Sequence, residues 1–203
     1  MTPAHDGETL AWYDREAPVY ANRRPAERNA RLEAFLGRLS PGAAILELGC
    51  GGGQDAEVMI AAGFDVTPTD GSPGLAAEAE RRLGRAIRVM RFEDLDEIER
   101  YDAVWANACL LHVPEAALPD ILGRIRRALK PGGVFFASFK AGDGGDGGDR
   151  DGFGRYYNFV SREGLDAAYA EGGRWSELTM TEMPGGGYDG VPRTWLLCLA
   201  VKG

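Results

Sequence analysis

A glycine-rich segment at residues 45–55, with the sequence ILELGCGGGQD, has residue types that favour ligand chemistry. Gly49 and Gly51 allow the backbone to approach a ligand without a Cβ in the way. A helix that begins near Gln54 would present free N–H groups, which favour anionic groups. Glu47 precedes the first glycine by two residues. A carboxylate there would repel a diphosphate and attract an ammonium or a sulfonium.

Two phosphate-binding motifs fit this segment poorly. A phosphate loop would need a Lys-Ser/Thr pair after the glycines, where this chain has Gln54-Asp55. A dinucleotide site would need a third glycine at position 54, which is glutamine. The extra glycines Gly52 and Gly53 make the alignment to that motif ambiguous. A nicotinamide-dependent oxidoreductase therefore stays as an alternative. Glu47 also has a structural interpretation, as a strand-end residue bonded to a neighbouring amide.

Four further segments, each at or after a predicted strand, belong with the glycine-rich segment. They are VTPTD ending at Asp70, RFEDL, YDAVWANACLLHVP and ALKPGGVFFAS. With ILELGCGGGQD, they resemble the class I S-adenosylmethionine-dependent methyltransferases, of the small bacterial type that acts on small molecules, over about residues 30–140. Asp70 lies 23 residues after Glu47, close to the offset of roughly 20 residues expected for a ribose-binding acid in related folds.

The resemblance implies S-adenosylmethionine as the cofactor and a set of residues that bind it. Asp70 is similar to the family acid that accepts from the ribose hydroxyls, and Arg24 could pair with the methionine carboxylate. Either Glu93 or Asp94 could accept from the adenine amine, and the choice between them stays open. The complete set is Tyr13, Tyr20, Arg24, Glu47, Gly49, Cys50, Gly51, Asp70, Gly71, Ser72, Glu93, Asp94, Ala106 and Asn107.

The implied reaction is an in-line methyl transfer to a small-molecule acceptor, and such sites often need no strong general base. The catalytic residues are therefore unknown, with four candidates near the implied site: His112, Tyr157, Arg155 and Tyr20. A neutral His112 could take a proton from the acceptor. Each candidate also has a purely structural interpretation, as a packed or hydrogen-bonded side chain. A binding module that keeps the pocket without turnover is a further alternative.

Composition sets broader limits on function. The 203 residues carry a formal net charge of −8, which disfavours a sequence-independent nucleic-acid binder. We expect neither a membrane span nor a secretory signal. Cys50, Cys109 and Cys198 are far apart in sequence and have no ligand partners at metal spacing. We therefore expect reduced thiols, a cytoplasmic location and no metal; the oligomeric state stays open.

Alternation of strand and helix patterns predicts the fold. Apolar runs at 43–48, 64–69, 86–90, 101–106 and 134–140 favour strands, with helices between them. Strands at 175–183 and 193–201 are joined closely enough for an antiparallel hairpin. With the resemblance, this predicts an α/β, Rossmann-like three-layer sandwich with a mostly parallel seven-stranded sheet and one antiparallel strand.

The expected domain organisation is a single methyltransferase domain over 1–203. Residues 1–24 are expected to cover the cofactor, and residues 8–23 within them are expected to form one or two short helical pieces, with Pro18 interrupting. His5 is expected to be disordered. The Gly/Asp-rich loop at 141–153 is expected to be flexible.

Overall fold

The computed structural model describes residues 4–23, 30–142 and 148–203. Its central feature is a seven-stranded sheet in the order β3-β2-β1-β4-β5-β9-β8. A separate two-stranded sheet pairs β6 with β7. The strands are β1 Ala44–Leu48, β2 Asp65–Asp70, β3 Arg88–Val89, β4 Tyr101–Ala106, β5 Leu129–Lys140, β6 Asp149–Arg150, β7 Tyr156–Tyr157, β8 Trp175–Gly186 and β9 Pro192–Lys202.

The topology confirms the expected sheet. Strands β3, β2, β1, β4 and β5 pair in parallel, whereas β9 is antiparallel to both of its neighbours, β5 and β8. Strand β9 is thus the one antiparallel strand, and it lies next to the edge. The chain reverses its direction of strand addition between β1 and β4, where ligands of open α/β sheets bind beyond the carboxyl ends of the strands.

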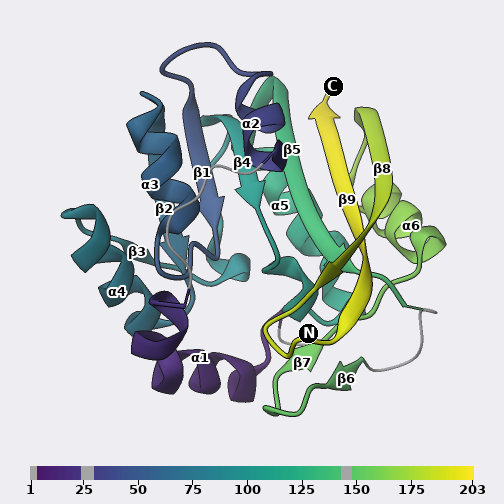
Figure 1. The fold of residues 1–203 in the computed structure, drawn as a ribbon. Coiled ribbons are helices and arrows are strands. Elements are labelled where there is room, and N and C mark those ends of the chain that lie inside the picture. Colours follow the sequence, from purple (N-terminus) through teal and green to yellow (C-terminus); the bar gives the residue numbers. More distant parts are fainter. Residues whose placement is uncertain (1–3, 24–29, 143–147) are drawn as a thin grey trace.

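Helices cover both faces of the sheet, which gives the expected three layers (Figure 1). The helices are α1 Gly7–Ala21, α2 Ala30–Leu36, α3 Gln54–Ala61, α4 Pro73–Leu83, α5 Leu118–Ala128 and α6 Arg162–Gly172. Side chains of α2 and α3 share a core with Ile45, Val66 and Trp105. Side chains of α5 and α6 share the other core with Leu46 and Val104. The alternation of strand side chains between two faces explains this division.

Helix α1 is one continuous helix, so the expected interruption at Pro18 is wrong. Proline removes one backbone donor, but Ala17 and Ala21 are buried against Leu75 of α4, and this packing holds the helix together. The Asp14 carboxylate also accepts from the Gly74 N–H at 2.6 Å, at the amino end of α4. An anion at that end is favoured by the helix dipole.

Several element boundaries differ from the sequence expectation. Strand β3 has only two residues, and β8 continues to Gly186, so the hairpin turn is shorter than predicted. Helix α2 covers Ala30–Leu36 and precedes β1, and residues 24–29 lie outside the described part of the chain. Within the Gly/Asp-rich loop at 141–153, Asp149–Arg150 form strand β6, which pairs with β7. In the described residues, no helix has both the length and the apolar character needed to span a bilayer.

Candidate active site

The glycine-rich turn joins the carboxyl end of β1 to α3. Gly49 and Gly51 adopt φ angles of 63° and 57°, which L side chains rarely adopt. A Cβ on Gly49 would lie 2.5 Å from the Cβ of Cys109, so this glycine is also required by packing. The Cys50 N–H donates to the Thr69 carbonyl at 2.9 Å, which ties the turn to the end of β2.

Asp70 ends β2 beside this turn. Its Oδ2 accepts from the Gly51 N–H and its Oδ1 from the Ser72 N–H, both at 2.8 Å. Burial raises the pKa of Asp70 to about 6, although the two backbone N–H groups act in the opposite direction. Each carboxylate oxygen has a second lone pair. Asp70 is therefore held firmly and can still accept two further hydrogen bonds.

Glu47 lies on β1, where only 3% of it is exposed. Its Oε2 has no hydrogen-bond partner among the described residues. Burial, together with the nearby Asp55 and Asp70, raises the pKa of Glu47 well above its usual range. The alternative interpretation, in which this oxygen bonds to a neighbouring amide, is not what the geometry shows. An unpaired carboxyl oxygen is costly when buried, and a cationic ligand would relieve that cost.

A groove runs along both sides of the glycine turn, and we describe it as two lobes. Four residues, Tyr20, Gly49, Gly51 and Ala108, line both lobes. The first lobe is further lined by His5, Asp6, Thr9, Leu10, Tyr13, Asp70, Gly71, Leu75, Met90, Arg91, Phe92, Cys109 and His112. The second lobe is further lined by Arg23, Arg31, Glu47, Cys50, Gly52, Gln54, Asp55, Asn107, Met183, Pro184, Gly185, Gly186, Gly187, Tyr188 and Trp195.

Helix α1 carries Tyr13 into contact with His112. The Tyr13 hydroxyl lies 2.9 Å from His112 Nε2, and His112 Nδ1 lies 2.5 Å from the Tyr156 carbonyl oxygen. A carbonyl only accepts, so Nδ1 carries the proton, Nε2 is the acceptor, and the Tyr13 hydroxyl donates to it. Burial lowers the pKa of His112 to about 4, so the ring is neutral near pH 7.

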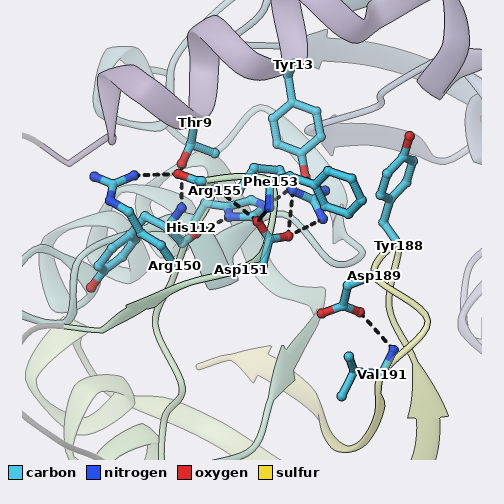
Figure 2. A network of polar contacts seen from close by, with 12 residues as sticks. Thr9, Tyr13, His112, Arg150, Asp151, Phe153, Arg155, Tyr188, Asp189 and Val191 are labelled. Atoms are coloured by element: carbon cyan, nitrogen blue, oxygen red, sulfur yellow. Dashed lines mark hydrogen bonds and ion pairs between the residues drawn. The ribbon is translucent and has the colours of Figure 1, made fainter.

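Arg155 completes this chain of polar contacts (Figure 2). Its Nη1 donates to the Tyr13 hydroxyl oxygen at 3.0 Å, and its Nε and Nη2 donate to the Asp151 carboxylate. Its guanidinium lies 4.5 Å from the centroid of the Trp12 ring and 4.9 Å from that of Tyr188. Neither Arg155 nor Tyr157 lines either lobe. Arg155 is connected to the groove by its hydrogen bond to Tyr13, which lines the first lobe.

The groove unites most of the predicted cofactor residues. Those that line it are Tyr13, Tyr20, Glu47, Gly49, Cys50, Gly51, Asp70, Gly71 and Asn107. Ser72 instead caps α4, Ala106 is buried in β4, and the Asp94 carboxylate accepts from the Arg91 N–H. The Glu93 carboxylate contacts the ring of His5 at the rim of the first lobe. Arg24 lies outside the described residues.

Sequence reasoning missed several groove residues. His5 lies in the described structure and lines the first lobe, so its expected disorder is wrong. Leu10, Met90 and Phe92 give that lobe an apolar wall. The β8–β9 hairpin reaches the second lobe with Tyr188, whose ring stacks on Tyr20 at a centroid distance of 5.4 Å. No local motif marks these residues, because distant contacts place them.

Residues 45–133 match the sequence model of a methyltransferase domain. A ubiquinone biosynthesis O-methyltransferase of Xanthomonas axonopodis pv. citri is 36% identical over 137 residues, which are 63% of this chain and 55% of that protein. The chain thus spans about half the length of this curated relative.

Two solved methyltransferases resemble the structure. One is the 1,6-didemethyltoxoflavin-N1-methyltransferase of Burkholderia thailandensis, with bound 1,6-didemethyltoxoflavin and S-adenosylhomocysteine (TM-score 0.65, 24% identity, 98% of this chain and 83% of that one). The other is the Haemonchus contortus phosphoethanolamine N-methyltransferase 2 with S-adenosyl-L-methionine (TM-score 0.72, 19% identity, 93% and 57%). These likenesses concern the fold. The match over residues 45–133 shows a methyltransferase domain within the chain, and the two solved structures show that the chain has the fold of these methyltransferases.

Proposed function

We propose that this chain transfers the methyl group of S-adenosylmethionine to a small-molecule acceptor. The observation that carries the proposal is the pair of carboxyl groups at the ends of β1 and β2. Glu47 has a buried oxygen with no partner among the described residues, and Asp70 has free acceptor capacity, on either side of the glycine turn. This arrangement suits a ligand with a cationic end and a vicinal diol.

The lining residues fit the parts of this cofactor. Asp70 would accept from the ribose hydroxyls, and Leu10, Met90 and Phe92 of the first lobe would enclose the adenine. Glu47 would pair with the methionine ammonium in the second lobe. Arg31, which lines the same lobe, would pair with the methionine carboxylate, a role that sequence reasoning gave to Arg24. Helix α1 would cover the cofactor.

The residues shared by the two lobes mark where the reacting methyl group would lie. When bound, the cofactor supplies an electrophilic methyl group on a positively charged sulfur, so alignment of the acceptor provides much of the rate. Tyr13 lines the first lobe, as does His112, which its hydroxyl contacts. The Tyr13 hydroxyl would take the proton of the acceptor while passing its own proton to Nε2 of His112.

The comparisons support this proposal. The curated relative is named an O-methyltransferase, and a solved neighbour holds a small heterocycle with S-adenosylhomocysteine. They give no support to the nicotinamide alternative. The Gln54 amide donates to the Ala21 carbonyl at 2.7 Å, so this side chain occupies the position where a dinucleotide site needs a glycine.

The net charge of −8 argues against a nucleic-acid acceptor, and three free cysteines suit a cytoplasmic location.

Calorimetry with S-adenosylmethionine and S-adenosylhomocysteine tests the proposal, with NADH as the comparison ligand. We expect micromolar binding of both adenosyl ligands and none of NADH. A second stage measures transfer of labelled methyl to a panel of phenols, amines and thiols. Absence of adenosyl binding at millimolar ligand would contradict the proposal, whereas binding without transfer to any acceptor would favour a non-catalytic module.

A further inference from the structure

Lys140 ends β5 with a buried and poorly partnered amine. Its side chain is 2% exposed, and its Nζ has no hydrogen-bond partner among the described residues. The nearest carboxylate oxygen, Asp189 Oδ2, is 3.8 Å away, beyond hydrogen-bond distance. The Nζ also lies 3.8 Å from the centroid of the Tyr157 ring. An ammonium has three donors, and burying it without acceptors is expensive.

Two more cations lie around this amine. Arg155 and Arg193 both act electrostatically on Lys140, as do the carboxylates of Asp151 and Asp189. Arg155 is satisfied by Asp151 and by Tyr13, whereas the Nε of Arg193 is buried and has no hydrogen-bond partner in the part of the chain that the structure describes. Asp151 is already engaged by Arg155, and Asp189 lies beyond hydrogen-bond distance of Lys140. The two buried donors that lack a partner among the described residues, on Lys140 and Arg193, favour an additional anion at this place.

The turn of the β8–β9 hairpin separates this cluster from the second lobe. A Cβ built on Gly187 would lie 2.7 Å from Lys140 Nζ, so the lysine amine lies directly against the turn backbone. Gly187 and Tyr188 also line the second lobe. Asp189 belongs to the same turn, and Figure 2 shows it beside Tyr188, near the Arg155 network. A small displacement of this turn would join the lysine amine to the groove.

The cluster also borders the proposed proton acceptor. The Tyr157 ring, which lies under the lysine amine, is 4.6 Å from the ring of His112 between centroids. A molecule with its anionic group at Lys140 could therefore extend toward Tyr13 and His112.

We propose that Lys140 binds an anionic group of the methyl acceptor, a carboxylate or a phosphate, and that Asp189 takes the place of this group when no acceptor is bound. The inference rests on the proposed function and names the chemical class of its substrate. The acceptor anion would displace Asp189 with the hairpin turn and would supply the hydrogen bonds that the Lys140 amine lacks.

The test is calorimetry on the protein saturated with S-adenosylhomocysteine. One pair of probes is 4-hydroxybenzoate with the neutral 4-hydroxybenzamide, and the other is phosphoethanolamine with ethanolamine. We expect the anionic member of at least one pair to bind at least tenfold more tightly. The pair that shows this preference identifies the anion as a carboxylate or a phosphate.

Substitutions then assign the preference to Lys140. Lys140→Met should abolish it, and Asp189→Asn should strengthen anion binding several-fold, because it removes the competing carboxylate. Lys130→Met is the matched control, since Lys130 lies on the same strand but pairs with Asp102 away from the groove. It should leave the preference unchanged.

Each outcome has a distinct meaning. Failure of S-adenosylhomocysteine to bind would contradict the proposed function itself. Normal binding of S-adenosylhomocysteine without an anion preference, or with a preference that survives Lys140→Met, would overturn only the role of Lys140. If Lys140→Met does not fold, as judged by circular dichroism, Asp189→Asn decides alone, and an unchanged anion affinity in that variant overturns the inference.

Discussion

The Tyr13 hydroxyl donates to Nε2 of His112 at 2.9 Å, although 99 residues separate the two in the sequence. Arg155 donates to the same hydroxyl oxygen, so Tyr13 links a fixed cation to a neutral imidazole. Burial raises the pKa of Tyr13 well above its usual range, and the hydroxyl therefore keeps its proton near pH 7. Tyr13 is thus suited to relay a proton and unsuited to remove one alone.

Tyr13→Phe should lower kcat roughly a hundredfold, within the usual contribution of general acid–base catalysis. Binding of S-adenosylhomocysteine should change little, because the ring and its packing are kept. Steady-state kinetics with any acceptor found in the panel, together with calorimetry, separates the two effects. Tyr101→Phe is the control and should retain full activity, because Tyr101 begins β4, at the end of the strand that is away from the groove. An unchanged kcat in Tyr13→Phe would exclude the relay.

The raised pKa of Asp70 leads us to expect that cofactor affinity depends on pH. With a pKa of about 6, Asp70 is ionised above that pH and protonated below it. The ionised form accepts from both ribose hydroxyls, whereas protonation removes acceptor capacity. Affinity for S-adenosylhomocysteine should therefore fall between pH 7 and pH 5, with a midpoint near 6. Asp70→Asn should bind weakly at every pH, without this midpoint. A midpoint that persists in the variant would assign the titration to another group.

We expect Glu47 to release a proton when the cofactor binds. Burial raises the pKa of Glu47 well above its usual range, which favours the protonated carboxyl before the ligand binds. The methionine ammonium favours the ionised carboxylate, so binding should release up to one proton. Calorimetry in two buffers of different ionisation enthalpy measures this release. Glu47→Gln should abolish it and lower the affinity, and equal heats in both buffers for the unsubstituted protein would contradict the pairing.

The mostly parallel sheet with its C-terminal hairpin, and much of the groove, could be predicted from sequence because local patterns encode them. The apolar runs and the capping residue Ser72 specify strands and helices directly, and the parallel pairing of β1 with β2 brings Glu47 and Asp70 to the same edge of the sheet. The strand-helix alternation then leaves few topologies.

The remaining groove residues depend on packing between distant segments. Leu10 reaches the first lobe because α1 docks on α4 through Asp14. Tyr188 reaches the second lobe because β8 and β9 extend past their apolar cores. Neither position has a sequence signal of its own. Pro18 even gave a misleading one, since tertiary packing outweighed its local preference.

Gly49 and Gly42 form a matched pair for measuring how tightly the glycine turn is packed. Both have positive φ angles, 63° and 73°, but a Cβ on Gly42 would meet no atom of the described residues within 4 Å. Gly42→Ala should therefore cost only the backbone strain, about 1–2 kcal/mol of unfolding free energy. Gly49→Ala should cost about 1–3 kcal/mol more, because its Cβ would overlap that of Cys109.

Urea denaturation of the two variants measures this difference. Adding Cys109→Gly to Gly49→Ala should recover part of the loss, because it removes the overlapping atom, whereas adding it to Gly42→Ala should only destabilise further. Equal losses in the two single variants would mean that the turn relaxes around the new methyl group. In that case Gly49 would be required for its backbone conformation alone, and close packing against Cys109 would not contribute to the shape of the groove.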